Sequence, residues 1–207
     1  VVASWLAGQA AVVMLLAVLL AAPSAQSLAT DLAAADKRGG DFSADFPQTY
    51  TDKLRGKSRT ESGNLWVKAD GRVRWSYTKP ESKDFVFDGQ QAYFYEPENA
   101  QVTVFEQFEQ SPLWSALRFL WGRGSTGELF DLKLCQVSCE AGVTGDRILE
   151  LTPRQPLATV QRALLAIEPT THRVRAARVY DALGNRTDYA FSAFHFGLKL
   201  GGERFHF

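Results

Sequence analysis

Side chains that could carry out catalysis or bind a metal ion are scattered along this 207-residue chain. The three histidines lack the spacing of metal ligands: His172, His195 and His206. The carboxylates that invite a search for an acid–base pair all lie in expected turns: Glu81, Asp84, Asp88 and Glu96. The sequence also lacks the nucleophile-elbow, zinc-protease, phosphate-loop and dinucleotide-binding motifs. We therefore predict no catalytic residue, no metal site, no cofactor and no enzymatic activity.

The beginning of the sequence predicts export from the cytoplasm. Residues 10–22 form a continuous apolar run that is short for a membrane span and long enough for the core of a signal peptide. Small residues follow at Ser24, Ala25 and Ser27, as a signal-peptidase site requires. We expect residues 1–27 to be a cleaved signal peptide, with a retained membrane anchor as the alternative. Residues 28–207 would then form one exported domain.

Charged residues are balanced, with 23 Lys and Arg against 23 Asp and Glu. Binding to nucleic acid depends on a basic face that neutralises phosphates. We therefore expect no nucleic-acid partner.

Cys135 and Cys139 lie in the connection between two expected strands. In an exported protein, two cysteines this close in sequence favour a disulfide, with two free thiols as the alternative. Because the closed loop is small, the bond would stiffen a turn rather than hold the fold together.

Residues 63–105 predict four consecutive antiparallel strands. Asp70-Gly71 and Asp88-Gly89 are hairpin turns, and Pro97 ends the fourth strand. In the second strand one face is apolar: Val73, Trp75 and Tyr77. The other face is polar: Arg72, Arg74, Ser76 and Thr78.

Two segments predict helices. Residues 28–38 have an amphipathic pattern that stops at Gly39-Gly40, and they would form either a mobile cover or a plain packing helix. Residues 111–124 have an N-cap Ser111 followed by Pro112. Their apolar face consists of Leu113, Trp114, Leu117, Leu120 and Trp121. This helix would be either packed permanently on the sheet or a lid over a ligand cavity.

The remainder of the chain predicts further strands at residues 130–134, 147–152, 160–167, 173–181, 185–196 and 204–207. With the earlier strands this makes about ten strands and two or three helices. The expected class is α+β with one large antiparallel sheet.

An ordered set of motifs then resembles the family of LolA-type outer-membrane lipoprotein carriers. The motifs are F-x-x-x-F-x-Q from Phe42, G-x-L-W-V-K from Gly63, R-W-x-Y-T-x-P from Arg74, D-G followed by Y-x-P from Asp88, and Q-V-T-V from Gln101. Later motifs keep the family's order: L-x-P from Leu151, D-x-x-G-N-x-T from Asp181 and the closing F-x-F at Phe205. The resemblance covers nearly all of residues 28–207.

The resemblance implies an open antiparallel half-barrel whose concave apolar face is capped by helices, with acyl chains held between sheet and lid. Val73, Trp75 and Tyr77 would line that face. It also implies a role in the periplasm, where the protein would receive acylated lipoproteins from an inner-membrane ABC exporter, shield their acyl chains, and pass them to an outer-membrane acceptor lipoprotein. We expect the carrier to be a monomer.

One departure from the family leaves the cargo open. Ala69 stands where the family usually has an arginine that hydrogen-bonds the lid. A carrier or sensor of another lipid, such as a glycolipid, is therefore an alternative, and a secreted hydrolase or a structural β-domain is a third. A lipidated receptor is disfavoured because residues 21–30 contain no cysteine.

Overall fold

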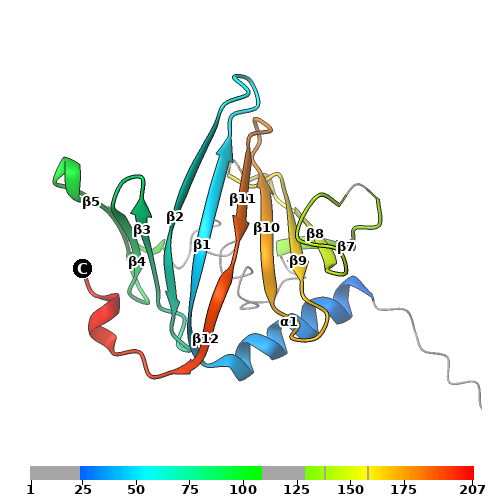
Figure 1. Cartoon of the computed structure of the whole chain (residues 1–207), viewed down its shortest axis with the longest axis horizontal. Helices are drawn as coiled ribbons and strands as arrows, with labels where there is room; N and C mark the ends of the chain where they lie inside the picture. Colours follow the sequence, from blue (N-terminus) through cyan, green and yellow to red (C-terminus); the bar gives the residue numbers. More distant parts are fainter. Residues whose placement is uncertain (1–23, 109–128, 138, 158) are drawn as a thin grey trace, which may run out of the picture.

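The computed structural model describes residues 24–108, 129–137, 139–157 and 159–207, which form a strongly curved sheet with a helix across one end (Figure 1). The elements of the first half are α1 (Ala25–Gly39), β1 (Asp41–Thr51), β2 (Ser58–Val67), β3 (Val73–Lys79), β4 (Lys83–Phe87), β5 (Ala92–Glu96), η1 (Pro97–Asn99) and β6 (Gln101–Phe105). Those of the second half are β7 (Phe130–Leu134), β8 (Arg147–Pro153), β9 (Arg162–Ile167), β10 (Val174–Tyr180), β11 (Arg186–Ala190), β12 (Ser192–Leu198) and η3 (Gly202–Phe205).

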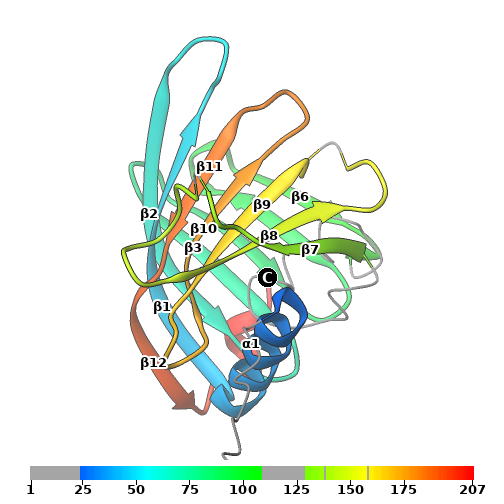
Figure 2. The same cartoon turned by 90° about the vertical axis from the view of Figure 1, so that its right-hand side faces the viewer.

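The sheet has 12 strands in the order β6-β5-β4-β3-β2-β1-β11-β10-β9-β8-β7, with β12 beside β1. All neighbouring strands are antiparallel. Within the described part of the chain no pairing joins β6 to β7, so the sheet is open, and Figure 2 shows it curling into a half-barrel. The predicted class and architecture are confirmed, although the strands outnumber the ten that we expected.

The prediction of one strand over residues 185–196 is wrong. β11 and β12 are separate strands that lie end to end along one edge of β1, β12 at its beginning and β11 at its end. Phe191 separates the two strands, and Ala193, the second residue of β12, has a φ of 49°, so the chain is not regularly extended where β12 begins.

The first helix begins earlier than predicted, at Ala25 rather than Leu28. Ser24 is the N-cap: its side chain accepts a hydrogen bond from the Ser27 N–H, and the Ser27 side chain accepts one from the Ser24 N–H. The predicted helix over residues 111–124, with Leu113, Trp114, Leu117, Leu120 and Trp121, lies outside the described residues. Among the helices that are described, none has the length and apolar character needed to cross a membrane.

The predicted strand over residues 204–207 is also wrong, because these residues form η3 and a short tail against the sheet. Phe205 is fully buried, and the Phe207 ring stacks on Tyr93 with 5.6 Å between centroids. The Arg204 guanidinium lies 4.9 Å from the centre of the Trp66 ring. An alternation of aromatic and polar residues fits a strand, but here the rings pack onto the face of the sheet instead of pairing at its edge.

Candidate functional site

The concave face of the sheet is assembled from cross-strand rows of side chains. Because side chains alternate between faces, every second residue of a strand and its direct partners form one row. The row nearest α1 contains Phe42, Val67, Val73 and Phe87. The next contains Ala44, Leu65, Trp75, Phe85 and Phe94. These two rows are entirely apolar.

Aromatic rings meet where the second row gives way to the third. The Phe46 ring lies 5.1 Å from both Trp75 and Tyr77, edge to face in each case. The Tyr189 ring from β11 lies 5.5 Å from Trp75. The Tyr77 hydroxyl donates a hydrogen bond to Gln48 Oε1 at 2.7 Å. Neighbouring strands thus contribute to one aromatic surface, which consists of Phe46, Trp75, Tyr77 and Tyr189.

The two tyrosines of this surface stay protonated far into the alkaline range. Burial raises the pKa of Tyr189 to about 12, and the nearby Glu61 charge acts in the same direction. Burial also raises the pKa of Tyr77 well above its ordinary value, and Tyr189 and Glu61 add to the effect.

The predicted lining residues Val73, Trp75 and Tyr77 therefore lie together in the apolar cluster of the concave face. Arg74 and Ser76 point to the convex face, where both bind Asp84, and Arg74 Nη2 lies 2.7 Å from its Oδ2. The alternation predicted for β3 is thereby confirmed.

The residue at the family's arginine position, Ala69, lies in the turn between β2 and β3. Its N–H donates a hydrogen bond to Asp41 Oδ1 at 2.7 Å, and the same carboxylate accepts one from the Leu200 N–H at 2.9 Å. Arg72 pairs with Asp70 at 2.6 Å. Arg72 and Arg74 thus both pair with carboxylates away from the concave face.

The two flanks of the sheet differ, and we call β2–β6 the first wing and β7–β10 the second wing. On the concave side the second wing presents aliphatic residues: Leu149, Leu151, Ala163, Leu165, Ile167 and Ala177. α1 packs against β7 and β8 and buries Leu28 and Leu32 in the same cluster. α1 thus covers part of the second wing, where Leu132 and Leu134 stay half-buried. On the first wing the half-buried residues are aromatic: Tyr77, Phe85 and Phe94.

Sequence reasoning missed one feature of the concave face, an ion pair between Glu61 and Lys83. Lys83 Nζ lies 2.6 Å from Glu61 Oε1. The signal was present in the two-residue period of β2, since Glu61 shares a face with Leu65 and Val67. It was hidden because the partner, Lys83, lies beyond a turn and because the β2–β3 register shifts between Ser62 and Gly63.

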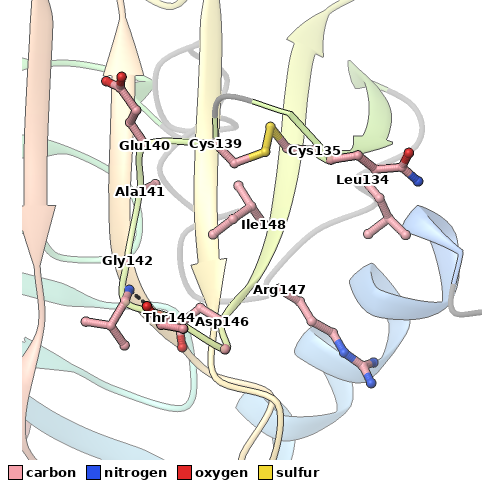
Figure 3. Close-up of a pocket in the computed structure, with 13 residues that line it drawn as sticks. Leu134, Cys135, Cys139, Glu140, Ala141, Gly142, Thr144, Asp146, Arg147 and Ile148 are labelled. Carbon is pink, nitrogen blue, oxygen red and sulfur yellow. Dashed lines mark hydrogen bonds between the residues drawn. A yellow bond between two sulfur atoms is a disulfide. The ribbon is translucent and has the colours of Figure 1, made fainter.

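The cysteines lie on the convex side of the second wing. Cys135 and Cys139 form a disulfide with 2.09 Å between the sulfur atoms. Figure 3 shows the disulfide near Ile148, at the start of a loop that continues through Glu140 and Gly142 to Asp146. This loop covers a small cluster of Ile148, Leu164 and Ala166, and the pocket that it lines lies on the opposite side of the sheet from the aromatic surface. Across the described residues, no group of three or more His, Cys, Asp or Glu side chains could hold a metal ion.

The chain is similar in sequence to known proteins. Residues 40–207 match the family described as outer membrane lipoprotein carrier protein LolA. The outer-membrane lipoprotein carrier protein of Nitrosospira multiformis is 32% identical over 165 residues, which cover 79% of this chain and 76% of that protein. The protein of the same name from Chromobacterium violaceum is 30% identical over 190 residues, which cover 91% of this chain and 86% of that protein.

Among solved structures, an uncharacterized conserved protein from Thermus thermophilus shares the fold. Its TM-score is 0.56 at 13% identity, over 87% of this chain and 91% of that one. At that identity the likeness concerns the fold alone, whereas the sequence matches concern the family. The chain therefore belongs to the LolA family of outer membrane lipoprotein carriers.

Proposed function

We propose that this protein is a periplasmic, non-enzymatic carrier that holds the acyl chains of lipoproteins against the concave face. It would receive them as a monomer from an inner-membrane ABC exporter and deliver them to an outer-membrane acceptor lipoprotein. The observation that supports this most directly is the set of half-buried aromatic side chains on the concave face of the first wing, Tyr77, Phe85 and Phe94. Val73, Trp75 and Tyr77 would form the floor of the acyl site. Leu113, Trp114, Leu117, Leu120 and Trp121 would provide its lid.

The energetics favour a face that is only partly open. Each buried methylene contributes about 0.8 kcal/mol, so complete burial of two or three long acyl chains would prevent release. A shallow apolar surface buries part of each chain and lets cargo pass to a partner that buries more. Aromatic side chains suit a carrier because they offer a large contact area and lose little rotamer entropy.

The identity of the cargo is tested by purifying the protein from the periplasm and identifying co-eluting acyl species by mass spectrometry. We expect triacylated lipoproteins. A free glycolipid instead would favour the alternative cargo suggested by Ala69, and the absence of any acyl species would contradict a carrier function.

The position of the acyl site is tested by Phe85→Glu, which places a carboxylate on the half-buried part of the concave face. We expect the yield of bound acyl species per mole of protein to fall at least about tenfold, since a charge would have to share the site with hydrocarbon. Val104→Glu is the matched control: Val104 faces the convex side opposite Tyr93 and is 49% exposed. Equal loading of the two variants, both folded by circular dichroism, would contradict the assignment of this face.

A further inference from the structure

The concave face changes character along the strands. Beyond the two apolar rows, the third row contains Phe46, Gly63, Tyr77 and Lys83. The row after it contains Gln48, Glu61 and Tyr189. Arg59 and Tyr50 follow as the next pair. The side chains thus pass from apolar beside α1, through aromatic, to polar and charged toward the tip of the β1–β2 hairpin in Figure 1.

Three charged side chains form the polar end of this gradient. Glu61 is 4% exposed, and its Oε1 atom lies 2.6 Å from Lys83 Nζ and 3.2 Å from Arg59 Nη2. Lys83 Nζ also lies 4.6 Å from the centre of the Tyr77 ring. The cluster therefore adjoins the aromatic surface directly.

Stability alone does not account for a buried ion pair at this position. Withdrawing two charges from water costs several kcal/mol, and apolar side chains of similar volume commonly serve the fold as well or better. The neighbouring rows show that apolar residues do pack at equivalent positions on these strands. The charged cluster is thus better explained by a ligand than by the core.

The cluster has one more cation than anion and retains unused donors. Among the described residues, Glu61 is the one hydrogen-bond or ion-pair partner of Lys83 Nζ, which leaves further N–H groups of the ammonium available. The Arg59 side chain is 63% exposed and contacts Glu61 through one nitrogen, so most of its donors are also available. Donors with an excess positive charge bind acceptor-rich oxygen groups, and anionic ones most strongly.

We propose that Arg59 and Lys83, held in place by Glu61, form a binding site for the anionic head group of an amphiphile. The acyl chains of the same molecule would lie on the Trp75 and Phe85 rows, toward α1. This inference rests on the proposed carrier function and extends it, because it fixes the direction in which the cargo lies along the strands.

The test uses two single-chain probes with the same tail, dodecyl phosphate and tetraethylene glycol monododecyl ether, each titrated calorimetrically below its micellar concentration. We expect the full chain to bind the phosphate about tenfold more tightly at low salt, since both cations reach its oxygens. Lys83→Gln and Arg59→Gln should each bring the ratio of the two dissociation constants close to one while affinity for the neutral probe is kept. Arg59→Gln keeps the test decisive if loss of Lys83 leaves Glu61 unpaired and impairs folding.

Lys57→Gln is the matched control, since it removes an exposed positive charge from the β1–β2 turn, away from the ion pair. We expect this variant to keep the preference for the phosphate. A preference that survives both Arg59→Gln and Lys83→Gln, or that falls as much with Lys57→Gln, would overturn the head-group site. Equal binding of both probes by the unmodified chain would overturn the head-group site and leave the carrier function standing. Binding of neither probe would overturn both.

Discussion

The first wing and the second wing differ in the side chains that they place on the shared concave face. The first wing presents aromatic rings, among them Trp75, Tyr77 and Phe85, several of them half-buried. The second wing presents aliphatic side chains, among them Leu149 and Leu165, that are fully buried. The two flanks of one continuous sheet thus differ in chemistry, the first mainly aromatic and the second mainly aliphatic.

This difference indicates a division of roles within one sheet. Leucine and isoleucine side chains are buried on the second wing, and α1 packs against it. Aromatic residues keep their shape when partly exposed, because they have few rotamers, and their polar atoms can face water. We infer that the second wing mainly stabilises the fold and that the first wing mainly binds the cargo.

The convex faces of the wings are also covered in different ways. η3 and the tail after it cover the first wing through aromatic and cation–π contacts, with Phe205 fully buried. The disulfide loop covers the second wing, where Glu140 Oε2 lies 3.1 Å from Arg178 Nη1. Each wing therefore has its own cover, and the covers can be weakened separately.

The strongest test of the difference between the wings is Leu165→Ala in the second wing. Leu165 is 0% exposed, so we expect the free energy of unfolding to fall by about 2–5 kcal/mol through lost transfer energy and a residual cavity. Chemical denaturation measures the loss. Leu183→Ala, at an exposed position, should change the free energy of unfolding by less than about 0.5 kcal/mol.

If the wings have the separate roles that we infer, folded Leu165→Ala protein should bind the dodecyl probes with nearly unchanged affinity. A loss of affinity as large as that expected for Phe85→Glu would contradict the division of roles.

The cover of the second wing is tested by the double substitution Cys135→Ser with Cys139→Ser. Opening a loop this short should lower the free energy of unfolding by about 2 kcal/mol, since little chain entropy is regained. Amide hydrogen exchange should show faster exchange in residues 139–146 and unchanged protection in the first wing. Equal acceleration in both wings would show that the loop stabilises the whole sheet rather than its own flank.

Much of the first wing could be predicted from local patterns. The two-residue alternation of β3 and the Asp-Gly turns specify strands and faces through short-range stereochemistry. The order of the motifs then allowed the family and the open half-barrel to be predicted. These features depend on residues that are close in sequence.

The missed features depend on contacts between distant residues. The break between β11 and β12 follows from both strands sharing one edge of β1. The F-x-F tail has the period of a strand, but Phe205 and Phe207 lie on the sheet face. Lys83 meets Glu61 only because the register of three strands brings them together.

The boundary between the wings is tested by the titration of Tyr189 in β11. Its pKa is about 12 in the folded protein and near 10 in the unfolded chain. Its contribution to stability is therefore complete below about pH 10 and is lost as the pH rises to about 12, because the unfolded chain releases this proton first. We expect the free energy of unfolding to fall more steeply in this window for the unmodified protein than for Tyr189→Phe. If the free energy of unfolding depended on pH in the same way for both proteins, the burial of this hydroxyl beside Trp75 would be contradicted.

The smallest effect is expected for Arg204→Ala in the cover of the first wing. The guanidinium contacts the Trp66 ring at an accessible surface, so its loss should lower the free energy of unfolding by about 0.5–1 kcal/mol. Arg204→Lys keeps the charge but loses the planar stacking. Its free energy of unfolding should therefore lie between those of the unmodified protein and Arg204→Ala. Lys199→Ala, also an exposed cation near the C-terminus, should have no measurable effect. Arg204→Ala could instead lower the free energy of unfolding as much as the double cysteine variant does. The cover of the first wing would then depend on this cation as strongly as the cover of the second wing depends on its disulfide.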